Sequence, residues 1–359
     1  MPFRIGSVTL SSNLCLAPLA GYTNLPFRRL IRELGGVGLC TTDLVNARSL
    51  LEGRAKALEL IASAPWDRPL AVQLYGSNPA ELAAAAQRLA DRGVDIVDLN
   101  MGCPVRKVCR TGSGAALLRD VQRAADLVYQ VVQAVRIPVT CKMRLGWDDT
   151  HITAPELARA FEQAGVAAIT IHGRTRQQGF TGTVNLDGIR AVVQAVRAIP
   201  IIGNGDVTTP QAAKTMFDRT GCAAVSIGRG AFYNPWIFQQ TQHYLETGEL
   251  LPEPTLEDRL TVMTRHLDYM IEFFGEARAC RMFRKIALQY ATRFGPAAEF
   301  RRRIVTLERR DQLPEILDAY RHWRAQFLDE AGNLLPAYAP RPFAAHPAIP
   351  VPAGPVERW

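Results

Sequence analysis

Short apolar runs recur about every 30 residues through most of this chain, which is the length of one strand–helix unit. There are eight of them, at residues 14–17, 37–41, 70–74, 96–100, 139–143, 168–172, 201–204 and 224–228. None alternates apolar with polar residues, so they predict a parallel sheet whose outer face is covered by helices. Eight strands are the number that closes a (β/α)8 barrel, or TIM barrel. We therefore predict an α/β chain with such a barrel at residues 1–250, and an open, doubly wound sheet is the alternative.

Helix-type segments lie between these runs and support the alternation of strands and helices. They cover residues 80–92, 121–135, 155–164, 186–196 and 210–218. Gly93, Gly165 and Gly221 follow three of them, where a glycine in the left-handed conformation commonly ends a helix.

The pattern changes in the last third of the chain. Between residues 255 and 328 apolar residues recur three and four positions apart, with no further strand-like run. This spacing predicts a small C-terminal helical domain at residues 255–330. Residues 336–359 hold seven of the 23 prolines, which predicts an extended tail.

The positive charge of the chain is concentrated in one segment. The formal net charge is +8 and the pI is about 9.3, which favours an anionic partner. Residues 278–310 hold ten basic residues and two acidic ones, Glu299 and Glu308. The net positive charge of this segment therefore equals that of the whole chain. This concentration predicts a binding surface for a polyanion, and a solvated helix face is the alternative.

Several classes of protein are disfavoured. No apolar run reaches the roughly 18 residues of a membrane span, and Gly, Ser and Asn interrupt the N-terminal segment where a signal peptide would be apolar. The seven cysteines form no C-x-x-C pair, so neither a zinc ribbon nor a disulfide framework is indicated. We expect a cytoplasmic protein with no metal and no membrane contact, and we expect a monomer.

Polar residues follow most of the predicted strands, and in a barrel the carboxyl ends of the strands surround one pocket. Gly205 and the Gly228-Arg229-Gly230 turn follow the last two strands, where barrels commonly bind a phosphate group. Lys142 would be a charge in the barrel mouth and needs an anionic or electron-rich partner to stay ionised. A reduced isoalloxazine ring supplies such a partner, and an ion pair with Asp98 or Asp206 is the alternative.

Five segments resemble blocks of one known family, the tRNA dihydrouridine synthases. They are residues 16–28 (LAPLAGYTNLPFR), 98–104 (DLNMGCP), 141–147 (CKMRLGW), 171–176 (IHGRTR) and 203–207 (GNGDV). The resemblance covers about residues 3–300 in order, and the 171–176 block is most similar to the bacterial B-type branch. It implies an FMN-dependent barrel, a helical domain that binds tRNA, and NADPH as the reductant.

The resemblance also assigns roles to individual residues. It implies that Cys103 is the general acid, and that FMN contacts Pro18, Leu19, Ala20, Gln73, Lys142, His172, Asn204, Gly205, Asp206, Gly228 and Arg229. Amides such as those of Gln73 and Asn100 also suit the edge of a heterocycle. We expect substrate contacts at Asn100, Arg144, Arg284, Lys285, Arg301, Arg302 and Arg303.

The chain departs from the family pattern at a few positions. Leu19 stands where the family often has Met, and Cys109 stands where Asn is usual. In the predicted helical domain, Ile286 and Gln289 replace a His and a Trp. The details of the tRNA contact, and the uridine that is modified, therefore stay open.

The activity that the resemblance implies is reduction of the C5–C6 double bond of uridines in tRNA to 5,6-dihydrouridine. This bond is conjugated to the C4 carbonyl, so hydride from N5 of reduced FMN enters at C6 and a proton from Cys103 enters at C5. A thiol with a pKa of about 8.5 is mostly protonated at neutral pH, and a uridine in folded tRNA must flip out to reach a barrel pocket. The alternatives are an FMN barrel that reduces a free small molecule, and an RNA-binding module that keeps the barrel as a scaffold.

Overall fold

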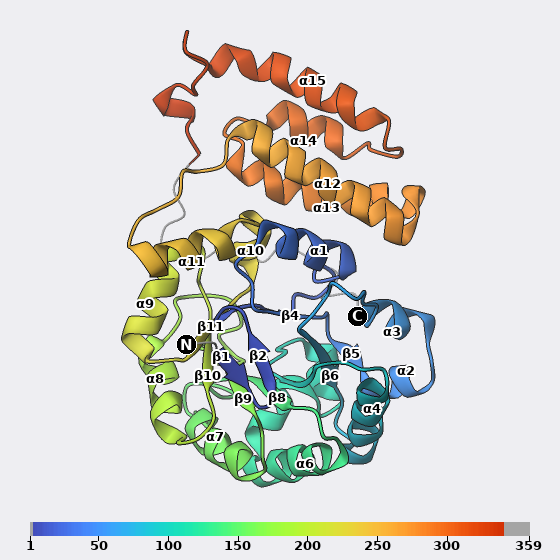
Figure 1. Cartoon of the computed structure of the whole chain (residues 1–359), viewed down its shortest axis with the longest axis vertical. Helices are drawn as coiled ribbons and strands as arrows, with labels where there is room; N and C mark the ends of the chain where they lie inside the picture. Colours follow the sequence, from blue (N-terminus) through green and yellow to red (C-terminus); the bar gives the residue numbers. More distant parts are fainter. Residues whose placement is uncertain (1–2, 341–359) are drawn as a thin grey trace.

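A closed barrel of parallel strands forms the larger part of the computed structural model, which describes residues 3–340 (Figure 1). Its eight strands are β3 (Leu14–Leu16), β4 (Leu39–Thr41), β6 (Leu70–Tyr75), β7 (Ile96–Met101), β8 (Val139–Arg144), β9 (Ala168–His172), β10 (Ile201–Asn204) and β11 (Ala224–Ile227). β4 pairs with both β3 and β6, which closes the sheet on itself, and the short β5 (Val45–Asn46) pairs beside the end of β6. The predicted barrel is confirmed, and the open doubly wound sheet is wrong.

Helices surround the barrel, as the alternation of segments predicts (Figure 1). They are α1 (Leu25–Leu34), α2 (Ala47–Leu51), α3 (Ala55–Leu60), α4 (Pro79–Asp91), α5 (Arg106–Arg110), α6 (Val121–Ala134), α7 (Ala154–Gln163), α8 (Leu186–Ala195), α9 (Pro210–Thr220), α10 (Arg229–Tyr233) and α11 (Ile237–Thr247), with the 3-10 helix η1 (Gly114–Arg119). Side-chain oxygens of Asn78 and Thr209 cap α4 and α9, and Gly221 ends α9 with φ +70°.

An antiparallel hairpin closes the amino-terminal end of the barrel, and the apolar runs did not reveal it. Its strands are β1 (Phe3–Ile5) and β2 (Val8–Leu10). Ile5 and Leu10 are fully buried and pack against residues at the starts of the barrel strands, among them Ile96 and Ala224. A ligand site in the barrel is therefore expected at the opposite, carboxyl end.

A helical part follows the barrel and consists of α12 (Leu256–Phe274), α13 (Glu276–Tyr290), α14 (Ala298–Ile304) and α15 (Gln312–Arg324), with the 3-10 turns η2 (Ala291–Arg293) and η3 (Ala325–Phe327). α12 packs on α1, and α13 packs on α10 (Figure 1). A capping box at Thr255 and Asp258 starts α12 at the predicted position.

The predicted proline-rich tail is described only over its first five residues. Residues 336–338 form a 3-10 turn, η4 (Pro336–Tyr338), in place of an extended segment. The Tyr338 ring lies 4.7 Å from the Phe327 ring, so the turn packs on the helical part. Residues 341–359 lie outside the described residues. Within residues 3–340, no helix is both long and apolar enough to cross a bilayer.

Candidate active site

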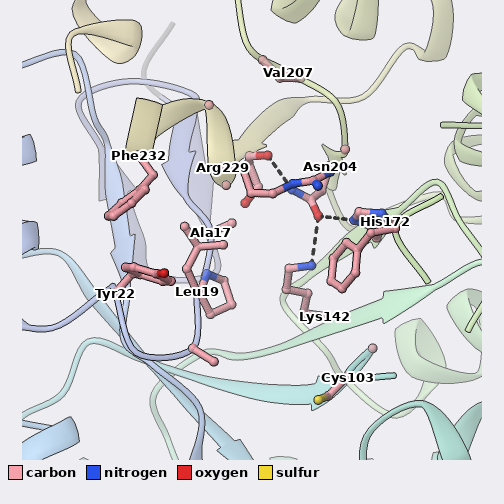
Figure 2. A pocket seen from close by; sticks show the side chains of 18 of the residues that line it. Ala17, Leu19, Tyr22, Cys103, Lys142, His172, Asn204, Val207, Arg229 and Phe232 are labelled. Atoms are coloured by element: carbon pink, nitrogen blue, oxygen red, sulfur yellow. Dashed lines mark hydrogen bonds between the residues drawn. The ribbon is translucent and has the colours of Figure 1, made fainter. Parts of the chain in front are cut away.

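A cavity of about 210 Å³ opens at the carboxyl ends of the barrel strands (Figure 2). Its lining includes every residue at which the resemblance implies an FMN contact: Pro18, Leu19, Ala20, Gln73, Lys142, His172, Asn204, Gly205, Asp206, Gly228 and Arg229. Asn100, Cys103 and Arg144 line it as well. The other expected contacts, Arg284, Lys285, Arg301, Arg302 and Arg303, lie on α13 and α14 and are not part of this lining.

Lys142, His172 and Asn204 form a hydrogen-bonded network in this cavity (Figure 2). Lys142 Nζ donates to Asn204 Oδ1 at 3.0 Å, and His172 Nδ1 is bonded to the same oxygen at 2.8 Å. Asn204 Nδ2 donates to the Ser226 carbonyl at 2.7 Å, which fixes the amide orientation. Because Asn204 Oδ1 only accepts, the proton of the His172 ring sits on Nδ1, and Nε2 is an acceptor.

Burial sets the charge of these groups. Burial, with Arg144 nearby, lowers the pKa of Lys142 to about 8, so the ammonium form still predominates at neutral pH. Burial also lowers the pKa of His172 well below its ordinary value, so the ring is neutral. In this network a cation, Lys142, thus lies beside a neutral acceptor, His172 Nε2.

The alternative in which Lys142 forms an ion pair with Asp98 or Asp206 is wrong. Asp98 Oδ1 accepts from the Thr140 hydroxyl at 2.6 Å, and the other oxygen of this carboxylate accepts from the Gln73 amide. Asp206 is paired with Arg174 at 2.6 Å. Both carboxylates are therefore engaged elsewhere, and Lys142 keeps its charge available for a ligand.

Three buried polar atoms of the lining have no partner within the described residues. They are His172 Nε2, the Tyr22 hydroxyl and the Thr208 hydroxyl. Because an unpaired buried polar group costs about 1–3 kcal/mol, such a group inside a cavity indicates a ligand that supplies its partner. The hydroxyls and ring N–H of a flavin fit these atoms. The sequence does not predict a ligand contact at Thr208, and it places Tyr22 in the 16–28 block without a predicted role.

The end of the cavity that is suited to a phosphate group lies at the start of α10. A side chain at Gly230 would collide with the Val207 carbonyl, so glycine is needed for α10 to approach the loop after β10. The Arg229 guanidinium lies 3.5 Å from Asp206, which also holds Arg174. Since a carboxylate repels an anion, Asp206 orients the two arginines here, and Arg229 is the group suited to a phosphate.

Cys103 lies on a turn that the neighbouring strands hold in place. Asn100 Oδ1 accepts from the backbone N–H groups of Gly102 at 3.2 Å and Cys103 at 2.9 Å. Asn100 Nδ2 donates to Gln73 Oε1 at 2.7 Å, and Gln73 Nε2 donates to Asp98. The two amides that were expected to face a heterocycle are therefore tied to each other and to the Cys103 turn.

The Cys103 side chain lies where two cavities meet. Burial raises the pKa of this thiol above its ordinary value, so it is protonated at neutral pH. A second cavity of about 180 Å³ shares Ala20, Leu44, Cys103 and Val105 with the first. It is also lined by Asp43, whose pKa burial raises to about 6. The Cys109 thiol donates to the Cys103 carbonyl at 3.4 Å, and this weak hydrogen bond stabilises the turn.

Arg144 was expected to contact the substrate, yet most of its guanidinium binds backbone. Nε donates to the Gly102 carbonyl at 2.8 Å, and Nη1 donates to the carbonyls of Thr175 at 2.9 Å and Gly179 at 2.7 Å. It thereby joins the Cys103 turn to the loop after β9. That loop places the Phe180 ring in the cavity, 5.1 Å from the Arg144 guanidinium, and sequence reasoning missed Phe180 because no periodic or motif signal marks it.

The five basic residues expected to bind tRNA in the helical part differ in their surroundings. Lys285 Nζ lies 5.0 Å from the ring of Tyr22, so this cation stands at the edge of the cavity. Neither Lys285 nor Arg301 has a carboxylate at ion-pair distance within residues 3–340. The other three are ion-paired within the protein: Arg284 with Glu308, and Arg302 and Arg303 with Glu299.

Comparison with known proteins agrees with this geometry. The family model described as dihydrouridine synthase (Dus) matches residues 15–324. The chain is 42% identical over 309 residues to tRNA-dihydrouridine synthase B of Pseudomonas aeruginosa, covering 86% of this chain and 92% of that protein. It is 40% identical over 299 residues to a probable tRNA-dihydrouridine synthase of Rickettsia prowazekii, covering 83% and 91%.

Among solved structures, histamine dehydrogenase from Rhizobium sp. 4-9 has a similar fold. The TM-score is 0.51 at 13% identity, over 75% of this chain and 50% of that chain. This likeness shows a shared barrel fold, whereas the family rests on the sequence matches. The chain belongs to the dihydrouridine synthase family.

Proposed function

We propose that this protein reduces specific uridines in tRNA to 5,6-dihydrouridine, with FMN as the bound cofactor and NADPH as the reductant. The observation that carries the proposal is that one cavity unites a protonated thiol, Cys103, with the cation Lys142 and the phosphate-type end at Arg229. The helical part, within residues 255–330, would serve as the tRNA-binding domain.

The residues of the cavity fit FMN. Arg229 and the glycine turn before α10 would hold the phosphate, and the unpartnered atoms of Tyr22, His172 and Thr208 would accept or donate the ligand's hydrogen bonds. Lys142 would stabilise negative charge on the ring system. When bound and reduced, the flavin supplies the hydride that adds to C6 of uracil.

Cys103 would supply the matching proton to C5. Uracil C5 gains electron density when C6 is attacked, because the double bond is conjugated to the C4 carbonyl. A thiol held protonated by burial can release its proton only to such a strong acceptor next to it, and Asn100 fixes the turn that presents it. Since the cavity lies within the barrel, the uridine must be flipped out of the tRNA to reach Cys103.

A direct test compares substrates. Purified protein with FMN and NADPH is expected to add two hydrogen atoms to uridines of unmodified tRNA, as read by mass spectrometry of nuclease digests. Free uracil and orotate are expected to remain unchanged, because neither engages Lys285 and the rest of the helical part. Turnover of the free pyrimidines with none on tRNA would instead favour a small-molecule reductase.

Arg229→Ala is expected to weaken FMN binding about 10- to 100-fold. The substitution removes a charge-assisted contact worth about 1.5–3 kcal/mol and leaves the Lys142 network intact. Fluorescence titration of the apoprotein with FMN measures the effect. Arg190→Ala on α8 is the matched control, because Arg190 is half-exposed and, within residues 3–340, forms an ion pair only with Asp187. Equal FMN affinity in both variants would refute the phosphate site.

The preference of the site for reduced over oxidised flavin is expected to fall as pH rises above about 8. The pKa of Lys142 is lowered to about 8, so the ammonium that stabilises anionic reduced flavin is lost from that pH upward. The midpoint potential of the bound flavin measures this preference. It is recorded from pH 6.5 to pH 9.5, about 1.5 pH units on either side of the Lys142 pKa. Lys142→Met should show a weaker preference without this pH dependence, and identical profiles would contradict the assignment.

A further inference from the structure

The basic segment 278–310 is largely neutralised by carboxylates in the folded protein. Seven of its ten basic residues are ion-paired, with distances up to 3.8 Å: Arg278 with Glu59, Arg284 with Glu308, Arg293 with Glu253, Arg302 and Arg303 with Glu299, Arg309 with Asp311, and Arg310 with Asp268. Within residues 3–340, Arg281, Lys285 and Arg301 remain without a carboxylate partner. A phosphate that binds the paired arginines must compete with a resident carboxylate.

A second group of basic residues has no such partners. It consists of Arg106, Lys107 and Arg110 on α5, Arg119 on η1, Arg123 on α6 and Arg176 after β9, and we call it the α5 surface. Arg176 is half-buried and the other five are exposed. None of the six has a carboxylate at ion-pair distance among the described residues. Residues 104–124 alone hold five basic residues against Asp120.

Packing brings members of this group together from different elements. The Arg123 guanidinium reaches within 3.5 Å of the position a side chain would take at Gly112, which follows α5. The guanidinium groups of Arg119 and Arg176 lie 5.0 and 4.7 Å from the ring centroid of Trp147. Arg176 Nε is buried and has no hydrogen-bond partner in the described part of the chain. This unpaired donor, in a group of basic residues without carboxylate partners, indicates a missing anion.

The α5 surface adjoins the candidate active site. α5 begins three residues after Cys103, and Val108 anchors it in the core. The Ala115 N–H of η1 donates to the Cys103 carbonyl at 3.1 Å, so the surface and the Cys103 turn are one packed unit. An anion bound here would therefore lie beside the mouth of the cavity.

The α5 surface and the helical part lie on opposite sides of that mouth. The helical part packs on α1 and α10 (Figure 1), and these helices follow β3 and β11, whereas α5 follows β7. In the order β3-β4-β6-β7-β8-β9-β10-β11, the closed barrel places β7 and β8 across from β11 and β3. A substrate that spans the mouth can thus contact both sides.

We propose that the α5 surface binds the sugar–phosphate backbone of the tRNA, across the cavity from the helical part, and makes the larger electrostatic contribution to tRNA binding. The inference rests on the proposed function, because tRNA is the polyanion whose uridine the cavity would accept. Unpaired guanidinium and ammonium groups bind phosphates and release the counterions of the nucleic acid without first breaking an ion pair.

The test compares two triple variants that remove equal charge. One carries Arg106→Gln, Lys107→Gln and Arg110→Gln, and the matched one carries Arg301→Gln, Arg302→Gln and Arg303→Gln. Affinity of the full-length holoenzyme for unmodified tRNA is measured over a series of salt concentrations. The α5 triple is expected to reduce the slope of log K against log salt by about 2–3, and the matched triple by about 1 or less.

A second variant, Arg119→Gln with Arg123→Gln, removes charge from η1 and α6 and leaves α5 unchanged. It is expected to reduce the slope by about 1–2, and all three variants should retain FMN and raise KM for tRNA more than they lower kcat. A wild-type slope in the α5 triple and the double variant would overturn the inference, even if dihydrouridine still forms. Failure of the wild-type protein to modify tRNA would overturn the proposed function, and the inference with it.

Discussion

Cys103→Ala is expected to lower dihydrouridine formation by about 10²- to 10⁴-fold, the range typical of a lost general acid. Alanine removes the proposed proton donor for C5, whereas the hydrogen-bonded network of Lys142, His172 and Asn204 lies on other strands and keeps its hydrogen bonds. FMN content and the rate of flavin reduction by NADPH should therefore stay near wild type. Single-turnover assays that follow flavin reduction and tRNA reduction separately measure both effects.

Cys109→Ala is the matched control for this experiment. Cys109 is the other half-buried cysteine among the described residues, and its thiol only donates a weak bond to the Cys103 carbonyl. Its loss should leave tRNA reduction near wild type. Unchanged tRNA reduction by Cys103→Ala would exclude the acid assignment, and a stalled reaction with NADPH would show instead that the flavin site had been damaged.

Asp67→Ala is expected to lower the free energy of unfolding by about 3–5 kcal/mol, the cost of breaking a buried ion pair from one side. Asp67 is fully buried and accepts from Arg28 Nε and Nη2 and from Arg32 Nε at 2.7–2.9 Å. Without it, the fully buried Arg28 guanidinium loses its counter-charge. Arg28 Nη1 also donates to the Thr23 carbonyl, and the Thr23 hydroxyl accepts from the Leu19 N–H in the cavity lining.

Urea denaturation followed by circular dichroism measures this change. Glu52→Ala is the control, because the Glu52–Arg54 pair at 2.6 Å is exposed and should be worth less than about 1 kcal/mol. FMN affinity should also decrease in Asp67→Ala, since the loop after β3 loses its support. Similar stabilities of the two variants would contradict the role given to the buried pair.

The barrel could be predicted because parallel strands buried on both faces read as apolar runs in the sequence. All eight runs became strands, and three glycines predicted at helix ends have φ of +70° to +91°. The β1–β2 hairpin was missed because each strand has three residues and points one side chain outward. α1 was missed as a helix because its segment was noted for its motif rather than for its periodicity.

The members of the site could be predicted from the strand ends, but their hydrogen-bond partners could not. Arg144 binds carbonyls of two loops, and any residue type could supply a carbonyl at those positions. Asn100 and Gln73 bind each other because β6 and β7 are neighbours in the closed sheet, which only the three-dimensional fold reveals. Phe180 reaches the cavity from a loop without periodicity.

The count of basic residues along the sequence predicted only part of the positive charge that has no carboxylate partner. Several carboxylates that neutralise the 278–310 segment, such as Glu59, Glu253 and Asp268, come from outside it. Conversely, the six residues of the α5 surface are spread over residues 106–176. Folding brings Arg123 to the end of α5 and places Arg119 and Arg176 at the same Trp147 ring. Charge density per segment is therefore a weaker guide to a binding surface than the pairing of each charge.

In the proposed function, this chain forms dihydrouridine in tRNA by means of Cys103. Mapping dihydrouridine in tRNA from the source organism with and without this gene tests it most directly. We expect at least one position to lose dihydrouridine in the strain without the gene, to regain it with the wild-type gene, and to stay unmodified with Cys103→Ala. Identical dihydrouridine maps in the two strains, or full restoration by Cys103→Ala, would contradict it.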